Sequence, residues 1–322
     1  MAMNAADIIK VFNFYTRLSP SYTKIGYYTR RLFWQSIRYD FNAQHWLVTG
    51  ASAGIGKAIM HTAATAGAEV LAVGRSEERL RAAIAELPDH VATRVTALIF
   101  DMSLQRETEQ LLQTLLSTQQ KINVLINNVG ILLHEFLSTE EGRETSFVTN
   151  LLSHFQLTKG LLRGAAFADN ATIVNMSSGG MYNVPQSIEG LNTVDASAYN
   201  GKAAYAFAKR GQMALTDYWN KNNHNANGLR VYAMHPGWAR TPGVDSALPG
   251  LVKTQGLILR NPAQGADTCL WLCARRPDIG AQQAIWFDRK PRPAHIYPST
   301  RTALCTTEEL VEYLRRELAS CV

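Results

Sequence analysis

The chain has 322 residues, a formal net charge of +6 and a hydrophobic content of 46%, enough to bury one large core. Its basic residues are scattered, so the charge does not indicate a nucleic-acid-binding protein, and no run of 18 apolar residues predicts a transmembrane helix. The four cysteines lie in the last fifth of the chain and no secretory leader is expected, so we predict a reduced, cytoplasmic protein without a metal site.

The first 42 residues form an extension rich in Phe, Tyr, Trp, Lys and Arg, without the alternation of strands. Two segments in it, residues 8–18 and 27–37, have the spacing of amphipathic helices that could lie peripherally on a membrane. Packing of the extension on the rest of the domain, or on an oligomer partner, is the favoured alternative.

From residue 43 to about 290, short β-branched runs alternate with longer amphipathic stretches, which is typical of βαβ units. The pattern predicts a single α/β domain with a Rossmann-type, doubly wound parallel sheet. Seven strands are predicted, at residues 45–49, 69–73, 93–100, 123–127, 171–176, 229–234 and 284–287. Helices are predicted between most of them, including residues 144–167, 202–220 and 262–274.

After the sixth strand, Pro and Gly residues interrupt the stretch from 242 to about 261, which predicts a loop or lid with short helices. Beyond Pro291 and Pro293 the chain is predicted to be irregular until a last helix over 307–318, with Thr307 as its N-cap. The predicted organisation is an extension (1–42), an α/β domain (43–290) and a C-terminal tail with a helix (291–322).

A glycine-rich turn follows the first predicted strand, in the segment Thr49-Gly-Ala-Ser-Ala-Gly-Ile-Gly56. A turn that closes a strand and opens a helix presents backbone N–H groups and the positive end of the helix dipole to a pyrophosphate. Gly50 permits the tight turn, Gly54 and Gly56 flank Ile55 and allow close approach, and Ser52 offers a hydroxyl. We predict a dinucleotide site here, with a purely structural turn as the alternative.

The spacing Thr-Gly-x-x-x-Gly-x-Gly resembles the cofactor turn of the short-chain dehydrogenase/reductase family. Two further motifs carry the same resemblance: Asn127-Asn128-Val129-Gly130, close to the family's Asn-Asn-Ala-Gly, and Pro236-Gly237-Trp-Ala-Arg-Thr241, which matches its Pro-Gly-x-x-x-Thr. The resemblance implies that the asparagines hold strand ends together and that Gly130 leaves room for the cofactor. It also implies that the segment from residue 236 to 241 lies along the nicotinamide.

Two predicted strand ends concern the adenosine half of the cofactor. Asp101, followed by Met102, matches the family position whose carboxylate meets the adenine amino group, and capping of a helix near Ser103 is the alternative for it. Arg75 stands where an acidic residue would bind the ribose hydroxyls of NAD, and a guanidinium there pairs instead with a 2′-phosphate. NADP(H) is therefore predicted over NAD(H), although Ala53 departs from the second basic residue that NADP-using relatives often carry.

Tyr205 and Lys209 are the predicted acid/base pair. Positions i and i+4 share one face of a helix, so both side chains can point into one crevice. A free phenol has a pKa of about 10, and a nearby ammonium, joined by an oxidised nicotinamide, is expected to lower that value. Tyr205 would then donate a proton in carbonyl reduction and accept one in alcohol oxidation. Because Tyr-x-x-x-Lys also occurs by chance, the prediction depends on the other motifs.

The resemblance implies two more catalytic residues. Ser178, at the end of the fifth strand, aligns with the family's catalytic serine, while Ser177 is expected to bond to backbone. Asn150 matches the helix asparagine that holds a water linked to the lysine. Tyr182 and Tyr199 lack a lysine four residues on and are predicted as walls of a substrate pocket.

The long segment from 179 to 204 resembles the retinol-dehydrogenase-like branch of the family, and residues 176–181, 235–244, 264–267 and 287–291 are typical of one subgroup of it. The resemblance implies an NADP(H)-dependent oxidoreductase for small, hydrophobic carbonyl or alcohol substrates, and a homo-oligomer. A dinucleotide-binding sensor or scaffold without turnover is the alternative function. An extended enzyme of nucleotide sugars is disfavoured by the glycine spacing.

Overall fold

The structure, a computed structural model, describes residues 19–222, 227–280 and 283–320. Within these ranges eight strands form one sheet: β1 (His45–Thr49), β2 (Glu69–Gly74), β3 (Val95–Ile99), β4 (Ile122–Asn127), β5 (Phe167–Met176), β6 (Arg230–Met234), β7 (Ala284–Phe287) and β8 (Lys290–Pro293). Their order across the sheet is β3-β2-β1-β4-β5-β6-β7-β8, and every neighbouring pair is parallel except β7 and β8. The predicted doubly wound α/β sheet is confirmed.

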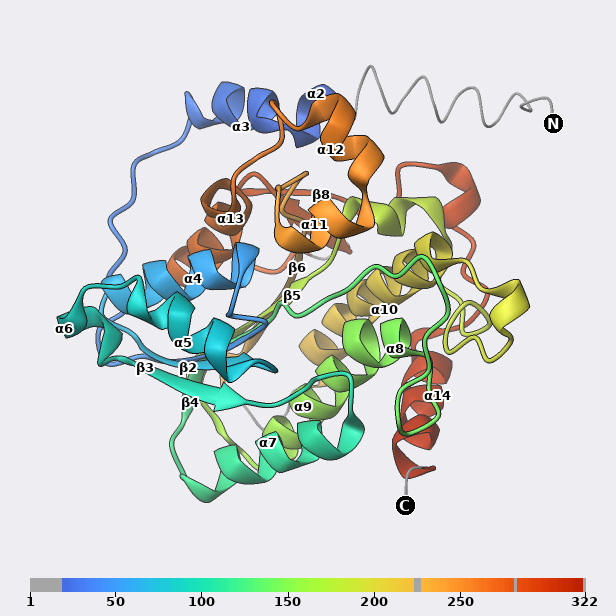
Figure 1. Cartoon of the computed structure of the whole chain (residues 1–322), viewed down its shortest axis with the longest axis horizontal. Coiled ribbons are helices and arrows are strands. Elements are labelled where there is room, and N and C mark those ends of the chain that lie inside the picture. Colours follow the sequence, from blue (N-terminus) through green and yellow to red (C-terminus); the bar gives the residue numbers. More distant parts are fainter. Residues whose placement is uncertain (1–18, 223–226, 281–282, 321–322) are drawn as a thin grey trace.

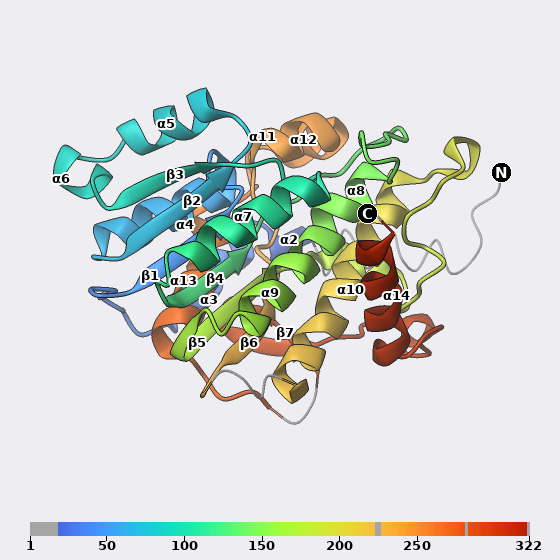
Figure 2. The same ribbon diagram turned by 90° about the horizontal axis from the view of Figure 1, so that it is seen from below.

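Helices cover both faces of this sheet (Figure 1), and Figure 2 shows the same layers from below. One face packs on α4 (Gly54–Thr65), α5 (Glu77–Ala85) and α13 (Pro262–Arg275), and the other on α7 (Gln105–Ser117), α9 (Ser153–Arg163) and α10 (Gly201–Asn222). Strand β1 illustrates how both faces of the sheet are buried. Successive side chains of a strand point to opposite faces, so Trp46 and Val48 enter the first core while Leu47 enters the second.

The remaining helical segments are short or lie at the edges. They are α2 (Ser19–Tyr22), α3 (Lys24–Arg31), α6 (Asp89–Ala92), α8 (Thr145–Phe147), α11 (Pro242–Ala247), α12 (Pro249–Gln255) and α14 (Thr307–Ala319), with a π-helical segment at Val148–Leu152 and 3-10 turns at Gly179–Asn183, Ala196–Ala198 and Pro298–Thr300. The short helices α11 and α12 confirm the prediction made for residues 242–261.

The position of β1 beside β4 indicates where a ligand would bind. The chain runs outward from β1 through β2 to β3, then returns to β4 on the other side of β1. In open α/β sheets, ligands bind outside the carboxyl ends of the strands at such a reversal. The glycine turn after β1 and the Asn128 segment after β4 therefore lie on the two sides of this crevice.

Strand β8 corrects the prediction that the chain is irregular beyond Pro291. Lys290–Pro293 pairs with β7 in antiparallel register, Pro291 opposite Trp286 and Pro293 opposite Ala284. The two strands join through Asp288 and Arg289, both with positive φ. Proline is tolerated on an edge strand because its missing N–H can face away from the sheet, and β8 is the outermost strand.

Two predicted helices differ in detail. The helix predicted over residues 144–167 is three consecutive segments, α8, the π-helical segment and α9, and ends at Arg163, so that β5 begins at Phe167. The last helix has Thr306, and not Thr307, as its N-cap: the Thr306 hydroxyl accepts from the N–H of Glu309, whose carboxylate accepts from the N–H of Thr306. This capping box satisfies donors of the first turn.

The N-terminal extension is partly described. Residues 8–18 lie outside the described ranges, and the helix predicted over 27–37 is instead α3, which begins at Lys24 and ends at Arg31. Tyr22 packs edge-on against His235 and Phe287, at centroid distances of 4.5 and 5.2 Å. This part of the extension thus lies against the carboxyl ends of β6 and β7. No helix of the described ranges is long and apolar enough to cross a membrane.

Candidate active site

The glycine turn has the backbone that its sequence requires. Gly50 and Gly54 have φ values of +68° and +55°, in the left-handed region that favours glycine. A Cβ on Gly56 would lie 2.1 Å from the carbonyl oxygen of Gly50, so no larger residue fits there. The side chain of Ile55 faces α13, where a Cβ on Gly265 would lie 3.2 Å from it. Ile55 therefore packs the turn against the helix layer.

The ends of β2 and β3 bring two predicted residues together. The Arg75 guanidinium lies 3.8 Å from the Asp101 carboxylate, and 71% of the Arg75 side chain is exposed. Asp101 also accepts hydrogen bonds from the backbone N–H and hydroxyl of Ser103, at 2.9 and 2.8 Å. It orders the turn before α7, which begins at Gln105 and not near Ser103. Met102 is buried beneath this turn.

The asparagines after β4 connect strand ends. Asn127 donates to the Asn175 side chain at the end of β5, at 2.8 Å, and Asn128 donates to the Thr49 carbonyl at the end of β1, also at 2.8 Å. The Thr49 hydroxyl accepts from the backbone N–H groups of Asn128 and Val129. These bonds hold three strand ends in register around the crevice.

Gly130 lies directly over the predicted catalytic residues. A Cβ on Gly130 would lie 2.9 Å from the Asn150 side-chain oxygen and 3.3 Å from Lys209 Nζ. The absence of a side chain at this position keeps the space above the lysine open.

Tyr205, Lys209 and Ser178 meet where α10 passes the end of β5. The Ser178 hydroxyl is close enough to the Tyr205 phenol to lower its pKa, and Lys209 Nζ lies 5.6 Å from the centre of the Tyr205 ring. Lys209 Nζ also donates to the Met176 carbonyl at 2.7 Å. Ser177 donates to the Lys209 carbonyl at 2.9 Å, which confirms its expected bond to backbone.

Burial dominates the electrostatics of this group. Burial raises the pKa of Tyr205, and the hydrogen bond with Ser178 only partly offsets that rise. Burial also lowers the pKa of Lys209 to about 7, because its ammonium loses hydration. The lowered phenol pKa was predicted for the complex with an oxidised nicotinamide, and it stays a prediction.

Asn150 has all of its polar groups occupied by protein. Its side-chain amide donates to the Ile131 carbonyl and the Ser146 hydroxyl, both at 2.8 Å, and its side-chain oxygen accepts from the Ile131 N–H at 2.9 Å. Its backbone carbonyl accepts from the side chain of Gln212 at 2.9 Å. Each of these polar atoms thus has a partner in the protein, each oxygen can accept one more hydrogen bond, and the water at Asn150 stays a prediction.

Gln212 is a neighbour of the site that the sequence analysis missed. Its side-chain oxygen accepts from Lys209 Nζ at 3.4 Å, and its amide nitrogen contacts His154 Nδ1 at 2.7 Å. The amide donates to Asn150, so its orientation is determined, and His154 Nδ1 must accept. Burial and the nearby Lys209 hold the pKa of His154 well below its usual value, against the opposing effect of Val129. A polar residue one turn after Lys209 on a buried helix face was the available signal.

The segment after β6 reaches the glycine turn. Gly237 has a φ of +76°, and a Cβ there would lie 2.7 Å from the Tyr22 carbonyl oxygen. The Pro236 carbonyl accepts a long hydrogen bond from Arg260 at 3.4 Å. Thr241 caps α11, and its methyl group would lie 2.8 Å from a Cβ on Gly54. Two predicted cofactor segments therefore touch each other.

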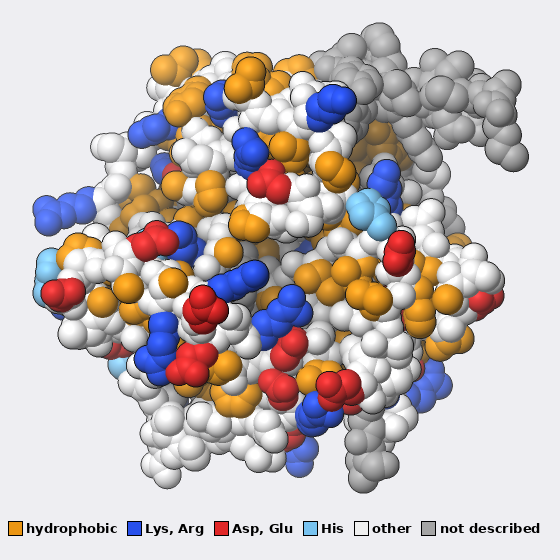
Figure 3. All heavy atoms as spheres, in the orientation of Figure 1, with side chains coloured by type: hydrophobic (Ala, Val, Ile, Leu, Met, Phe, Trp, Pro, Cys, Tyr) orange, Lys and Arg blue, Asp and Glu red, His pale blue; other side chains and the backbone are white. Residues whose placement is uncertain are grey.

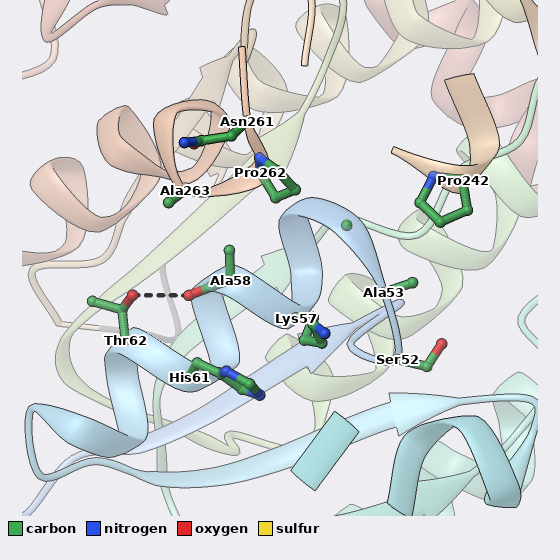
Figure 4. Close-up of a pocket in the computed structure, with 11 residues that line it drawn as sticks. Ser52, Ala53, Lys57, Ala58, His61, Thr62, Pro242, Asn261, Pro262 and Ala263 are labelled. Carbon is green, nitrogen blue, oxygen red and sulfur yellow. Dashed lines mark hydrogen bonds between the residues drawn. The ribbon is translucent and has the colours of Figure 1, made fainter. Parts of the chain in front are cut away.

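A cavity of about 560 Å³ opens beside this contact. Figure 4 shows Ser52 and Ala53 from the turn, Lys57 and His61 along α4, and Pro242 and Pro262 at the starts of α11 and α13. Lys57 pairs with the exposed Glu86 at 2.7 Å. It is a basic residue one helical turn beyond Ala53 that the sequence analysis did not select.

The two tyrosines predicted as pocket walls have other partners. Tyr182 is buried, and its hydroxyl donates to the Pro293 carbonyl at 3.1 Å. Tyr199 donates to the Glu144 carboxylate at 3.2 Å. Both hydroxyls therefore stabilise the fold locally. Among the described residues, no group of three or more His, Cys, Asp or Glu side chains is arranged to hold a metal ion.

Known proteins are similar to the chain in sequence and in fold. A family model for short chain dehydrogenase matches residues 44–250. The proteins called Dehydrogenase/reductase SDR family member 12 from Bos taurus and Homo sapiens are 36% and 33% identical to the chain; each alignment covers 92% of it, and 94% and 93% of the respective relative. Retinol dehydrogenase 13 from Homo sapiens is 27% identical over 75% of the chain and 70% of its own length. A short chain dehydrogenase structure from Escherichia coli CFT073, complexed with NADPH, is 25% identical with a TM-score of 0.58 and covers 74% of this chain and 94% of that one.

Proposed function

Because the chain belongs to the short-chain dehydrogenase/reductase family of oxidoreductases, we propose that it is an NADP(H)-dependent enzyme that interconverts a carbonyl and an alcohol. The observation that carries the proposal is the meeting of Tyr205, Ser178 and Lys209 at the end of β5, next to Gly130 after β4. When bound, the nicotinamide of the cofactor supplies or accepts the hydride.

Tyr205 is the proposed acid/base. In the reducing direction its hydroxyl gives a proton to the substrate oxygen while the carbonyl carbon gains a hydride, so the carbonyl becomes an alcohol. Ser178, which lies beside Tyr205, donates to the same oxygen and stabilises the charge that develops on it. In the oxidising direction both transfers reverse, and Tyr205 receives the proton.

Lys209 supports Tyr205 from the same helix face. With a pKa near 7, it is partly protonated at neutral pH, so its ammonium can favour the phenolate and its amine can take up a proton. Gln212 and the Met176 carbonyl hold Nζ in place. The positive charge of an oxidised nicotinamide would also favour the phenolate, against the effect of burial on Tyr205.

The choice of NADP(H) is supported by positive charge around the adenosine end. Arg75 is mostly exposed, and its contact with Asp101 at 3.8 Å is long enough to yield to a phosphate. Lys57 lines the cavity beside Ser52 and Ala53, one turn from the position where a second basic residue was expected. The similar structures from Escherichia coli and from Shigella flexneri, each 25% identical, are complexed with NADPH and NADP.

A hydrophobic substrate is proposed from the relatives named as retinol dehydrogenases. The segment from 179 to 204 delivers Tyr205 to the crevice and is held by the C-terminal region: Gln186 bonds to Cys305, and Asn192 bonds to Glu317. We propose that this segment forms a wall of the substrate site, and that residues 1–42 and 291–322 are additions around a domain of residues 43–290.

The test is NADPH consumption by purified protein across aldehydes and ketones of increasing chain length, with Tyr205→Phe as the matched variant. We expect turnover that the variant abolishes while it still binds NADPH, measured by fluorescence titration. If NADPH binds but no carbonyl in the panel is reduced, and Tyr205→Phe changes nothing in cells, the alternative of a dinucleotide sensor or scaffold replaces this proposal.

A further inference from the structure

Exposed apolar side chains are concentrated on α3, on the turn that follows it and on the turn after α12. Among the described residues, ten large hydrophobic side chains are exposed, and five of them lie here: Ile25, Tyr28, Leu32, Phe33 and Leu257. Because half of these exposed apolar residues lie on so few segments, they form a cluster and are not distributed evenly over the surface. Figure 3 shows hydrophobic side chains gathered at the top of the molecule, over α3 and α12. We call these five side chains the α3/α12 surface.

The two segments of this surface are joined to each other. The backbone N–H of Lys24 donates to the Ile258 carbonyl at 2.9 Å, and the Ser19 hydroxyl donates to the Gln255 side chain at 2.8 Å. Leu257 is therefore held beside the start of α3. The surface therefore combines residues more than 220 positions apart in the chain.

The opposite side of α3 anchors it firmly. Tyr27 is buried under the Arg260 guanidinium, 5.3 Å from its ring centre. Arg30 pairs with the buried Asp288 at 2.7 Å and lies 4.9 Å from the centre of the Phe287 ring. These contacts fix the inner face of α3, and Ile25 and Tyr28 lie exposed on the same helix. Leu32, Phe33 and Leu257 stay 81%, 85% and 89% exposed.

The charged residues on the two segments of this surface have one sign, and the nearest acid in α11, Asp245, is paired with Arg240. Lys24, Arg31 and Lys253 lie on its two segments, and the sequence contains no Asp or Glu from residue 19 to 39 or from 246 to 266. A second copy of the chain packed on this face would bring cations against cations, which disfavours a homodimer here. An anionic partner is favoured by complementarity.

We propose that the α3/α12 surface binds the interface of a membrane that contains anionic lipids. The three most exposed side chains project from the surface, which suits insertion among lipid headgroups, whereas stable protein interfaces bury such side chains in complementary pockets. The flanking lysines and arginine attract anionic headgroups. The binding would be peripheral and reversible, and it does not depend on any turnover at the proposed active site.

The experiment is co-sedimentation of the full chain with vesicles of phosphatidylcholine alone and vesicles that also contain phosphatidylserine. We expect wild-type protein to sediment with the anionic vesicles and to be released by added salt, which screens surface charge. The double variant Leu32→Asp with Phe33→Asp should lower the partition at least about tenfold, because two apolar side chains lose their insertion. Leu257→Asp should lower it in the same direction.

The matched control is Val194→Asp, which replaces a side chain that is 79% exposed elsewhere on the protein. It should sediment like wild type. Circular dichroism checks that each variant is folded. Wild-type protein that stays in the supernatant, a double variant that binds as wild type, or an equal loss in Val194→Asp would overturn the proposal. A wild-type protein that is dimeric in solution, together with a double variant that is monomeric, would also overturn the proposal, since a second copy would then cover the surface.

Discussion

The side chain of Gln212 donates to the backbone carbonyl of Asn150 at 2.9 Å, and the same side chain accepts from Lys209 at 3.4 Å. A protein amide therefore stands between the helix asparagine and the proposed catalytic lysine. Because its oxygen faces an ammonium and its nitrogen faces two acceptors, Gln212 cannot turn over without losing these bonds. It is a positioning residue for Lys209.

Gln212→Leu and Gln212→Glu should move the pH dependence of turnover in opposite directions. Loss of the oxygen removes a hydrogen bond to the charged lysine and lowers the pKa of Lys209 further, whereas a carboxylate raises it by roughly one to three units. The measurement is kcat against pH with NADPH and one reducible carbonyl. Identical pH profiles for both variants and wild type would show that Gln212 only fills space.

Lys209 should make the stability of the protein depend on pH. Its pKa is about 7 in the folded protein and 10.5 when unfolded, so the unfolded chain binds more protons between these values. Stability is therefore lowest below pH 7 and rises toward pH 10.5, by an amount on the order of a few kcal/mol. Lys209→Met removes this rise. Thermal unfolding of both proteins from pH 6 to about pH 9.5 tests it, and parallel curves would contradict the low folded pKa.

Arg75→Asp should weaken NADPH binding more than NADH binding. A charge-assisted bond from arginine to the 2′-phosphate is worth about 1.5–3 kcal/mol, and an aspartate adds repulsion, so a loss of at least about tenfold is expected. Fluorescence titration with both cofactors measures the ratio. Arg79→Asp is the control, because Arg79 is also exposed and lies one turn further along α5. An unchanged ratio in Arg75→Asp would remove Arg75 from the cofactor site.

Ser178→Ala should reduce kcat by roughly 10²- to 10³-fold, since one donor to the developing negative charge is lost. The pKa of Tyr205 should also rise further, because the bond with Ser178 is what opposes the effect of burial. Ser177→Ala is the comparison: its hydroxyl binds the Lys209 carbonyl, so a smaller loss is expected. Steady-state kinetics of both variants decide between these roles, and equal losses would count against Ser178.

Asp288→Asn should destabilise the whole protein. Asp288 is 1% exposed and pairs with Arg260 and Arg30, at 2.6 and 2.7 Å. Removing one partner of a buried ion pair costs about 3–5 kcal/mol. Asparagine tolerates the positive φ of this turn, so the loss can be assigned to charge. Denaturant unfolding measures it, with Asp278→Asn as the control, since Asp278 is 92% exposed.

The stability from Asp288 should also fall in acid. Burial by itself would raise the pKa of Asp288, but Arg260 and Arg30 outweigh it and lower the pKa below its usual value. A carboxyl with a lowered folded pKa contributes stability that is present above its unfolded pKa and is lost as pH falls through the folded one. The difference in stability between wild type and Asp288→Asn should therefore shrink at low pH.

Local patterns predicted most of the sheet and its crevice. The β-branched runs that mark β1, β2 and β4 are buried on both faces, so their composition alone identifies them. The glycine turn needs Gly50, Gly54 and Gly56 for backbone reasons that the sequence displays directly. Features that depend on neighbouring residues in this way can be predicted from the sequence alone.

Long-range contacts could not be predicted from the sequence in the same way. Lys290–Pro293 looks like a loop because of its two prolines, and only its place at the sheet edge makes it a strand. The pKa of Tyr205 depends on how deeply the fold buries it, and the partners of Asn150 include Gln212, 62 positions away. Such properties arise from packing between distant segments.

The carbonyl of Tyr22 accepts from the N–H of Trp238 and from Arg260, which lies 238 positions later in the chain. During synthesis the first helices leave the ribosome long before their binding site exists. At about 5–20 residues per second, they wait roughly ten to fifty seconds for Arg260 to be made. Until then their aromatic side chains are without their native cover, so a chaperone or a lipid surface near the ribosome would meet this segment before the rest of the protein does.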